Sequence, residues 1–330
     1  MATKTAPKKY SSVKLSSKVL KILRCPICNS ELKIGDNDCQ CINYECSTVF
    51  PKKKGVAILI DESCSIFKIN NFLNERDTFF DLSPRNKFVE FFKSLVPDIS
   101  LNIKGKQNYK RFTNILLSKS NNPKILVIGG SILGKGTEAL LENNNIELIE
   151  TDVSFGPRTQ LICDAHSLPF ADKSFDGVIA QAVLEHVVDP VQCVKEVYRV
   201  LKDDGIVYSE TPFIQQVHGG CYDFTRFTYL GHRRLFRKFE EIDSGATCGP
   251  AMALAWSYKY LLLSFTQSKL LGRFIELFVR FTAFPLKYLD YLLIDKTGSL
   301  DAASVYYFMG QKSHNIISDE ELITLYKGAN

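Results

Sequence analysis

The sequence of 330 residues predicts an α/β protein whose mostly parallel sheet carries helices on both faces. Two observations support this fold class. From residue 124 onward, short β-branched apolar runs recur at 125–128, 146–150, 160–163, 175–180 and 205–210. Between the last two runs, residues 190–201 place apolar side chains at helical spacing. Strands that alternate with amphipathic helices pair in parallel, because each helix returns the chain to the edge at which the previous strand began.

Composition and charge exclude several other classes of protein. The chain is 45% hydrophobic and 23% charged, which is typical of globular proteins and excludes global disorder and fibrous repeats. Seven of the 41 Lys and Arg residues lie within the first 24 positions, which contain no Asp or Glu. The rest of the chain contains 34 Lys and Arg residues and 36 Asp and Glu residues. The net charge of +5 is therefore a property of the N-terminal tail. This distribution argues against nucleic acid as a partner of the body.

The start of the chain lacks the pattern of a secretory signal, because its Lys- and Ser-rich residues include no apolar core. The longest uncharged apolar stretch, 244–258, is shorter than the roughly 20 residues that a membrane helix needs. We therefore expect a cytoplasmic protein with no transmembrane span. Its expected parts are a basic flexible tail (1–20), a cysteine-rich unit (21–60), connecting helices (61–123), an α/β domain (124–312) and a C-terminal tail (313–330). Within the connecting region, the pattern at 88–96 predicts a helix that Pro97 ends.

Six of the ten cysteines lie within the first 64 residues. Cys25 and Cys28 form one closely spaced pair, and Cys41 and Cys46 form a second. Four thiolates from two turns give Zn²⁺ its preferred tetrahedral site, and the metal stabilises a unit too small to fold on its core alone. Cys39 competes with Cys41 as the third ligand, and we favour Cys41 because Cys41 and Cys46 stand at the two ends of one turn. Free cysteines or a redox pair are the alternatives.

A glycine-rich loop follows the first strand of the α/β region. Gly129, Gly130 and Ser131 come directly after the run 125–128, and a short helix is expected at 138–141. Glycines at this turn let backbone N–H groups approach a ligand closely. Asp152 ends the second strand about twenty residues later, where a carboxylate accepts hydrogen bonds from ribose hydroxyls. A dinucleotide such as NAD would suit these two features as well.

The ordered motifs resemble class I S-adenosylmethionine-dependent methyltransferases, in particular the type 11 group. Besides the glycine loop and Asp152, they are CDAHSLPF at 163–170, SFDGVIAQAVLEHV at 174–187 and YRVLKDDG at 198–205. The resemblance covers about residues 124–211 and implies a Rossmann-like methyltransferase fold with a mostly parallel seven-stranded sheet. It also implies the cofactor contacts: Gly129, Gly130 and Ser131 at the methionine end, Asp152 at the ribose, Asp164 and Ala165 at the adenine, and Gln181 on the opposite side.

The cysteine-rich unit resembles the zinc ribbons of the tRNA-methyltransferase-activator family. The resemblance rests on LRCPIC at 23–28, CSTVFP at 46–51 and GVAILI at 55–60. Ribbons related to these often precede methyltransferase domains and are structural or partner-docking modules. The resemblance therefore implies that the bound zinc has no part in the chemistry.

Three features depart from the usual methyltransferase pattern. Val127 stands where an acidic residue is usual, and Ser131 stands where a second glycine is usual. Only residues 153–159 separate Asp152 from the third strand, so we expect the connecting helix to be lost or reduced to a turn. That loss leaves the adenine side open, unless the Phe-rich region 65–120 covers it.

Residues that could bind an acceptor follow the fifth strand, where ligands of open α/β sheets bind. The segment 218–236 gathers His, Arg and aromatic residues, which suits a polar or anionic acceptor. His218 is the candidate general base, and Tyr222, Asp223 and Arg226 are candidates for orienting the acceptor. A purely structural role stays open for Tyr222 and His218. We expect packing roles for His186 and His232, and His166 lies near the cofactor without an assigned role.

The sixth and seventh strands are expected at 239–244 and 304–309, separated by an apolar, aromatic insert at about 250–300. The insert predicts a helical cap or a homodimer interface in preference to peripheral membrane contact or a lid for a lipid-linked acceptor. Altogether we predict S-adenosylmethionine-dependent methyl transfer to a small-molecule or glycan-type acceptor. Two alternatives stay open. One is an RNA methyltransferase that docks RNA on the zinc ribbon, and the other is a non-catalytic methyltransferase-fold scaffold, which Val127 and Ser131 motivate.

Overall fold

The computed structural model describes residues 14–74, 95–132, 134 and 136–329, and the structural statements below concern these residues. The expected basic tail (1–20) and the expected helix at 88–96 lie largely outside them.

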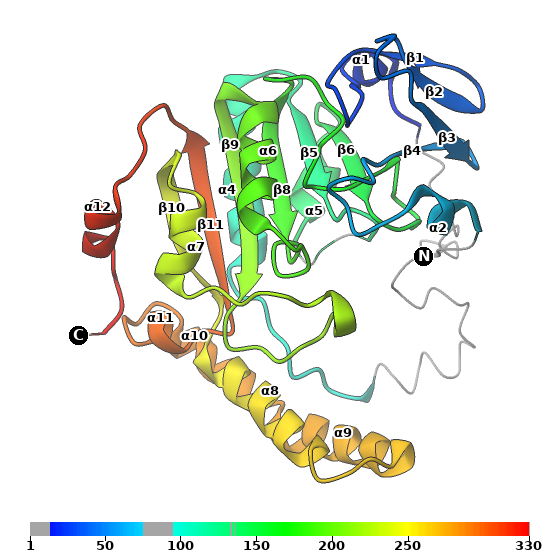
Figure 1. The fold of residues 1–330 in the computed structure, drawn as a ribbon. Coiled ribbons are helices and arrows are strands. Elements are labelled where there is room, and N and C mark those ends of the chain that lie inside the picture. The colour runs from blue at the N-terminus through cyan, green and yellow to red at the C-terminus, as the bar shows by residue number, and fades with distance from the viewer. Residues whose placement is uncertain (1–13, 75–94, 133, 135, 330) are drawn as a thin grey trace.

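A mixed sheet forms the centre of the molecule (Figure 1). Its main part runs in the order β7 (Leu161–Cys163), β6 (Glu147–Asp152), β5 (Lys124–Ile128), β8 (Phe175–Gln181), β9 (Leu201–Pro212), β11 (Val305–Lys312), β10 (Phe239–Cys248). The strands from β7 to β9 are parallel, whereas β11 is antiparallel to both β9 and β10. This arrangement confirms the α/β, Rossmann-like fold with a mostly parallel core sheet that the sequence predicts.

The cysteine-rich unit extends this sheet. Its strands are β1 (Leu32–Ile34), β2 (Asp38–Cys41), β3 (Val49–Lys53) and β4 (Val56–Leu59), each antiparallel to the next. The last of them, β4, pairs in parallel with β7 and places Ala57 opposite Leu161. All residues of β4 are buried, as expected for a strand covered on both faces. The cysteine-rich unit is thus part of the central sheet, whereas the sequence analysis expected a separate segment.

Helices cover both faces of the sheet. On one face, α4 (Gly105–Lys119) packs Tyr109, Phe112 and Leu116 against the sheet. On the other face, α6 (Pro190–Val200) packs Val194 and Val197 into the largest core cluster. The shorter helices are α1 (Ser17–Leu20), α2 (Ile69–Asn74), α5 (Glu138–Leu141), η1 (Gly220–Tyr222), α7 (Tyr229–Leu235) and α12 (Asp319–Thr324).

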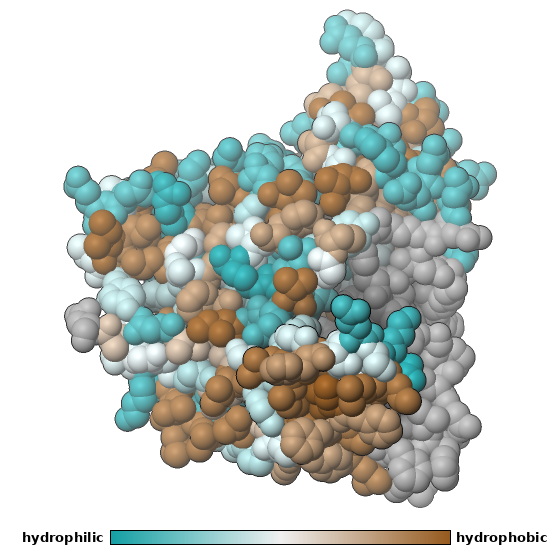
Figure 2. All heavy atoms as spheres, turned by 60° about the horizontal axis from the view of Figure 1, so that its bottom comes forward, coloured by the Kyte–Doolittle hydropathy of each residue, from teal (hydrophilic) through white to brown (hydrophobic). Residues whose placement is uncertain are grey.

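The expected insert is helical and lies at the end of the sheet to which β9 points (Figure 1). It consists of α8 (Pro250–Leu263), α9 (Lys269–Ala283), η2 (Leu286–Leu289), α10 (Asp290–Leu293) and α11 (Ser299–Ala302). The buried Asp290 ties its two ends together by accepting hydrogen bonds from the backbone N–H groups of Ala251 (2.8 Å) and Met252 (2.9 Å). Figure 2 turns this end toward the viewer and shows apolar side chains gathered over it. Within the described part of the chain, each helix is too short or too polar to cross a membrane.

Candidate functional site

A cavity of about 450 Å³ opens at the carboxyl ends of the parallel strands. Gly129 lines it just after β5, Gln181 at the end of β8, and Glu210 near the end of β9. Tyr109 of α4 and Met252 of α8 complete two of its walls. Ligands of open α/β sheets bind at this edge, so the cavity is the candidate active site.

Two glycines let the loop after β5 lie close to its neighbours. Gly129 has a φ of +73°, a left-handed conformation, and a Cβ atom there would lie 2.6 Å from the side chain of Val183. A Cβ atom on Gly134 would lie 1.7 Å from Oε1 of Gln181. The loop therefore packs directly against Gln181, which the sequence analysis placed opposite the glycine loop.

A hydrogen-bond network around Glu210 forms the floor of the cavity. Its carboxylate accepts hydrogen bonds from Gln181 Nε2 (2.9 Å), from Asn102 Nδ2 (3.2 Å) and from the Tyr208 hydroxyl. The Tyr109 hydroxyl in turn donates to Gln181 Oε1 at 3.0 Å. Burial raises the pKa of Glu210, and these hydrogen bonds oppose that shift. Of this network the sequence analysis found only Gln181, although a Glu in the apolar run 205–213 was a usable signal.

The predicted ribose contact, Asp152, lies beside the glycine loop but is turned away from the cavity. Its carboxylate accepts hydrogen bonds from the Ser131 backbone N–H (3.1 Å) and the Ser154 hydroxyl (2.8 Å), and the residue is 8% exposed. Ser131 is fully buried, and Gly130 donates its backbone N–H to Thr151. The structure thus brings Gly129, Gly130, Ser131 and Asp152 together, while only Gly129 of these lines the cavity.

The predicted adenine contacts, Asp164 and Ala165, are also buried. Asp164 accepts hydrogen bonds from the backbone N–H of His166 (3.0 Å), from its ring (2.5 Å) and from the Ser65 hydroxyl (2.5 Å). Burial alone would raise the pKa of Asp164, but the bonds from His166 and Ser65 hold it below its usual value. The short link 153–159 forms no helix, as predicted. This side is nevertheless covered by a cluster that includes Phe67, Phe72 and Phe155, so the Phe-rich region closes it in part.

Asp223 shapes the loop that carries His218. Its carboxylate accepts hydrogen bonds from the backbone N–H groups of His218 (2.8 Å) and Gly219 (3.2 Å) and from the Arg226 guanidinium (2.9 Å). Burial would raise the pKa of Asp223, and these donors hold it well below its usual range. His218 therefore lines the cavity, whereas Asp223 and Arg226 stand behind it. Tyr222 does not line the cavity, and its ring lies 5.8 Å from that of Phe67.

Glu185 is a site residue that the sequence analysis missed. It lies in the turn after β8, lines the cavity and is 0% exposed. Neither of its carboxylate oxygens has a hydrogen-bond partner among the described residues. Its Oε1 lies 3.8 Å from Nε2 of His218 and 3.9 Å from Nε2 of His186. Burial raises the pKa of Glu185 to about 8. The sequence signal was a Glu beside a His in the LEHV segment, immediately after a buried strand.

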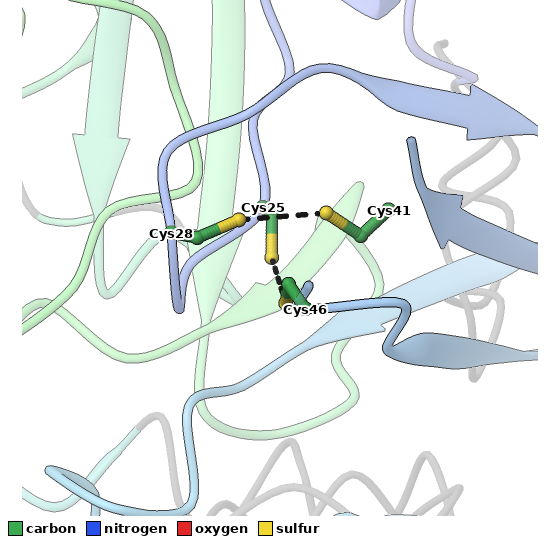
Figure 3. Close-up of side chains that lie close together, drawn as sticks. All are labelled: Cys25, Cys28, Cys41 and Cys46. Carbon is green, nitrogen blue, oxygen red and sulfur yellow. Dashed lines mark hydrogen bonds between the residues drawn. The ribbon is translucent and has the colours of Figure 1, made fainter. Parts of the chain in front are cut away.

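The four predicted zinc ligands converge in the ribbon (Figure 3). The sulfur atoms of Cys25 and Cys46 lie 3.8 Å apart, and those of Cys28 and Cys41 lie 3.4 Å apart. All four lie within 4.8 Å of one another. Tetrahedral Zn–S bonds of about 2.3 Å place sulfur atoms about 3.8 Å apart, so the donor set fits zinc. Cys39 is buried in the core cluster outside this group.

Comparisons with known proteins find similarity within the α/β part of the chain. Residues 130–209 match the family model described as "Methyltransferase domain". A ubiquinone/menaquinone biosynthesis C-methyltransferase, UbiE, of Desulfotalea psychrophila is 37% identical over 70 residues, which are 21% of this chain and 27% of that protein. The chain thus spans about a quarter of the length of the curated relative it matches.

Several solved structures are similar to this chain at lower sequence identity. A Haemonchus contortus phosphoethanolamine N-methyltransferase 2 gives a TM-score of 0.38 at 16% identity, covering 62% of this chain and 53% of that one. A Burkholderia thailandensis 1,6-didemethyltoxoflavin-N1-methyltransferase gives 0.36 at 14% identity, covering 62% and 78%. Residues 130–209 thus resemble a methyltransferase domain, and the sheet that contains them has the Rossmann-like α/β arrangement.

Proposed function

We propose that this protein transfers a methyl group from S-adenosylmethionine to a small polar acceptor held in the cavity. The observation that carries this proposal is the methyltransferase-domain match over 130–209, whose glycine loop and Gln181 line a cavity at the carboxyl ends of β5, β8 and β9. The bound cofactor supplies an electrophilic methyl group on a positively charged sulfur. The protein's main task is then to hold the acceptor in line with that methyl group.

The residues at the cavity suit this task. Gly129 and the network of Gln181, Glu210 and Tyr109 would hold the methionine end of the cofactor. Glu210, whose carboxylate accepts hydrogen bonds from neutral donors, lines the cavity and complements a sulfonium charge. Because no Lys or Arg is among the described lining residues, the charge favours a neutral polar acceptor over an anionic one. A glycan-type hydroxyl remains the acceptor class we favour, and the size of the cavity suits a small molecule better than RNA.

A non-catalytic scaffold is the second candidate function. It is favoured by one observation: Asp152 and Asp164, the residues proposed to hold the nucleoside, are buried and already hydrogen-bonded within the protein. For the cofactor to bind as in the family, Ser65 and the cluster that includes Phe67, Phe72 and Phe155 must give way at the adenine side. A protein that uses this fold only as a scaffold would leave that side closed.

Calorimetry with S-adenosylmethionine and S-adenosylhomocysteine separates the two functions. The enzyme predicts binding of both compounds, with a Kd on the order of micromolar, and a loss of at least about tenfold in affinity for Gln181→Ala. Glu142→Gln, an exposed change at the end of α5, is the control and keeps wild-type affinity. Absence of any binding by the zinc-loaded full chain would leave the scaffold as the function.

We infer a structural role for the four-cysteine cluster, like that of the zinc ribbons of the tRNA-methyltransferase-activator family. Two features support this inference. The cluster holds the turns that lead into the strands β1 to β4, and β4 continues into the central sheet. Bound zinc would stabilise this edge of the sheet, and the cluster lies apart from the residues that line the cavity.

A further inference from the structure

Three metal-ligand side chains meet at the wall of the cavity. Glu185 and His186 lie in the turn after β8, and His218 lies in the loop after β9. One ligand atom from each lies within 4.8 Å of the other two. Loops from two neighbouring strands thus place two imidazoles beside one buried carboxylate.

The hydrogen bonds of the two histidines leave the lone pair on the ring nitrogen that lies nearer to Glu185. Nδ1 of His186 lies 2.8 Å from the carbonyl oxygen of Tyr222, which can only accept, so Nδ1 carries the hydrogen and Nε2 the lone pair. Nδ1 of His218 lies 3.3 Å from the Gln216 carbonyl oxygen and 3.6 Å from the Asp223 carboxylate, which are also acceptors. A histidine whose second nitrogen donates to a carbonyl or carboxylate is the usual arrangement at metal centres.

When Glu185 is ionised, these tautomers leave acceptors facing acceptors. Two lone-pair nitrogens lie 3.8 and 3.9 Å from the same oxygen of Glu185, whose carboxylate has no hydrogen-bond donor among the described residues and is fully buried. A buried carboxylate without a donor is costly, and a cation placed between the three groups would satisfy all of them at once.

We propose that Glu185, His186 and His218 bind a divalent metal ion at the wall of the cavity. Two imidazoles and one carboxylate suit first-row ions such as Mn²⁺, Fe²⁺, Co²⁺ and Zn²⁺. Metal–ligand bonds of about 2.1 Å bring neighbouring ligand atoms to roughly 3.0–3.4 Å, so small side-chain rotations close the site. Glu185 and His218 line the cavity, and the remaining coordination positions therefore face the acceptor.

The proposed ion has a role in the reaction only if the chain is a methyltransferase, so this role rests on the proposed function. An acceptor hydroxyl bound at an open position would release its proton to solvent at lower pH than in water. Its oxygen would then form a bond to the methyl carbon as the carbon–sulfur bond breaks, which leaves S-adenosylhomocysteine. His218 would then act as a metal ligand and not as the general base that the sequence predicts.

The test uses the zinc-loaded full chain and Mn²⁺, monitored by the loss of the free-ion signal in electron paramagnetic resonance. Mn²⁺ prefers oxygen and nitrogen to thiolate ligands, so the cysteine cluster does not compete for it. We expect one bound Mn²⁺ per chain. Glu185→Gln and His218→Ala should each weaken binding at least about tenfold. Glu142→Gln and His314→Ala, which alter an exposed Glu and an exposed His elsewhere, are the matched controls and should bind Mn²⁺ like the wild type.

Calorimetry with S-adenosylmethionine on the same samples separates this proposal from the proposed function. Loss of Mn²⁺ in Glu185→Gln with the cofactor still bound supports the metal site and shows that the variant is folded. A wild-type chain that binds the cofactor but neither Mn²⁺ nor a second Zn²⁺ overturns the metal site and leaves methyl transfer intact. Mn²⁺ binding that Glu185→Gln and His218→Ala leave unchanged overturns it as well. Mn²⁺ binding without cofactor binding supports the site and overturns the enzyme.

Discussion

His232 lies in the core, where its Nε2 is 3.1 Å from the Ser209 hydroxyl and its ring packs on Phe236. Burial lowers the pKa of His232 to about 3. In the unfolded chain the same group has a pKa of about 6.5, so it takes up a proton there first as the pH falls. Its contribution to stability is therefore complete above about pH 6.5 and declines toward pH 3, by up to about 1.4 kcal/mol per pH unit.

His232 makes the free energy of unfolding fall as the pH falls, and the change His232→Gln isolates this contribution. Urea unfolding of the wild type and of His232→Gln is compared from about pH 7.5 to about pH 5, because groups with a raised pKa, such as Glu185, act in the opposite direction in both proteins. His232→Gln keeps a partner for Ser209 and cannot take up the proton, so the stability of the wild type should fall relative to that of His232→Gln by up to about 1.4 kcal/mol per pH unit. The neighbouring change Arg234→Gln, at an exposed position, serves as the control and keeps the wild-type slope. Equal slopes in the wild type and His232→Gln would contradict the prediction, because they would show that the ring takes up its proton equally in the folded and the unfolded chain.

Gly134 gives a sharper test of the cavity than any polar residue. A Cβ atom there would lie 1.7 Å from Oε1 of Gln181, so Gly134→Ala must push Gln181 away from Tyr109 and Glu210. We expect calorimetry to show at least about tenfold weaker binding of S-adenosylmethionine, with little change in melting temperature. Gly272→Ala is the matched control, because a Cβ atom there makes only an ordinary contact at 3.8 Å. Unchanged affinity in Gly134→Ala would place the cofactor elsewhere.

Disruption of the zinc ribbon should affect residues far from the ribbon itself. Its strand β4 pairs with β7, and Ser65, just after β4, donates a hydrogen bond to Asp164. We expect elemental analysis to find one zinc fewer per chain in Cys41→Ser than in the wild type, together with a lower melting temperature. Cys39→Ala removes a cysteine outside the cluster and should keep the zinc, although it opens a small cavity in the core. Zinc retained in Cys41→Ser and lost in Cys39→Ala would exchange the roles of the two cysteines.

Local patterns predicted the elements well, because strands and helices differ in the spacing of their apolar residues. The run at 175–180 became β8 (Phe175–Gln181), and the segment 190–201 became α6 (Pro190–Val200). What the sequence could not supply was contact between distant segments. The pairing of β4 with β7, the bond from Ser65 to Asp164 and the approach of His218 to Glu185 depend on where loops end in space. These contacts decide which predicted site residues line the cavity.

The helix α9 carries an exposed apolar face on the surface of the protein. Val279 and Ala283 are buried with Ala255 of α8. On the opposite side of α9 the exposed apolar residues are Leu270, Leu271, Phe274, Leu277, Phe278 and Phe281. A basic row of Lys269, Arg273 and Arg280 flanks this face on one side. The one acidic side chain of the helix, Glu276, pairs with Lys259 of α8 at 3.2 Å.

This arrangement favours an anionic lipid surface as the occupant of the α9 face, a change from the cap or dimer interface that the sequence favours. In a symmetric dimer the same face meets itself, and when the two α9 helices run antiparallel the two basic rows lie on the same side of the contact. A membrane instead takes up the apolar side chains and attracts the basic row through its headgroups. Contact at this end of the molecule would also bring the cavity, which Met252 of α8 lines, near the lipid.

Sedimentation with vesicles tests this occupant. The full chain should bind phosphatidylcholine vesicles that contain phosphatidylglycerol, bind pure phosphatidylcholine more weakly, and dissociate as salt is raised. The double change Phe274→Ser and Phe278→Ser should abolish binding, because it removes two exposed rings from the face. Ile323→Ser, at an exposed apolar position on α12, controls for a general loss of surface hydrophobicity and should bind like the wild type. Light scattering on the same samples reports the oligomeric state. A dimer that the double change dissociates, together with no vesicle binding by the wild type, would identify the face as a contact between two copies of the chain.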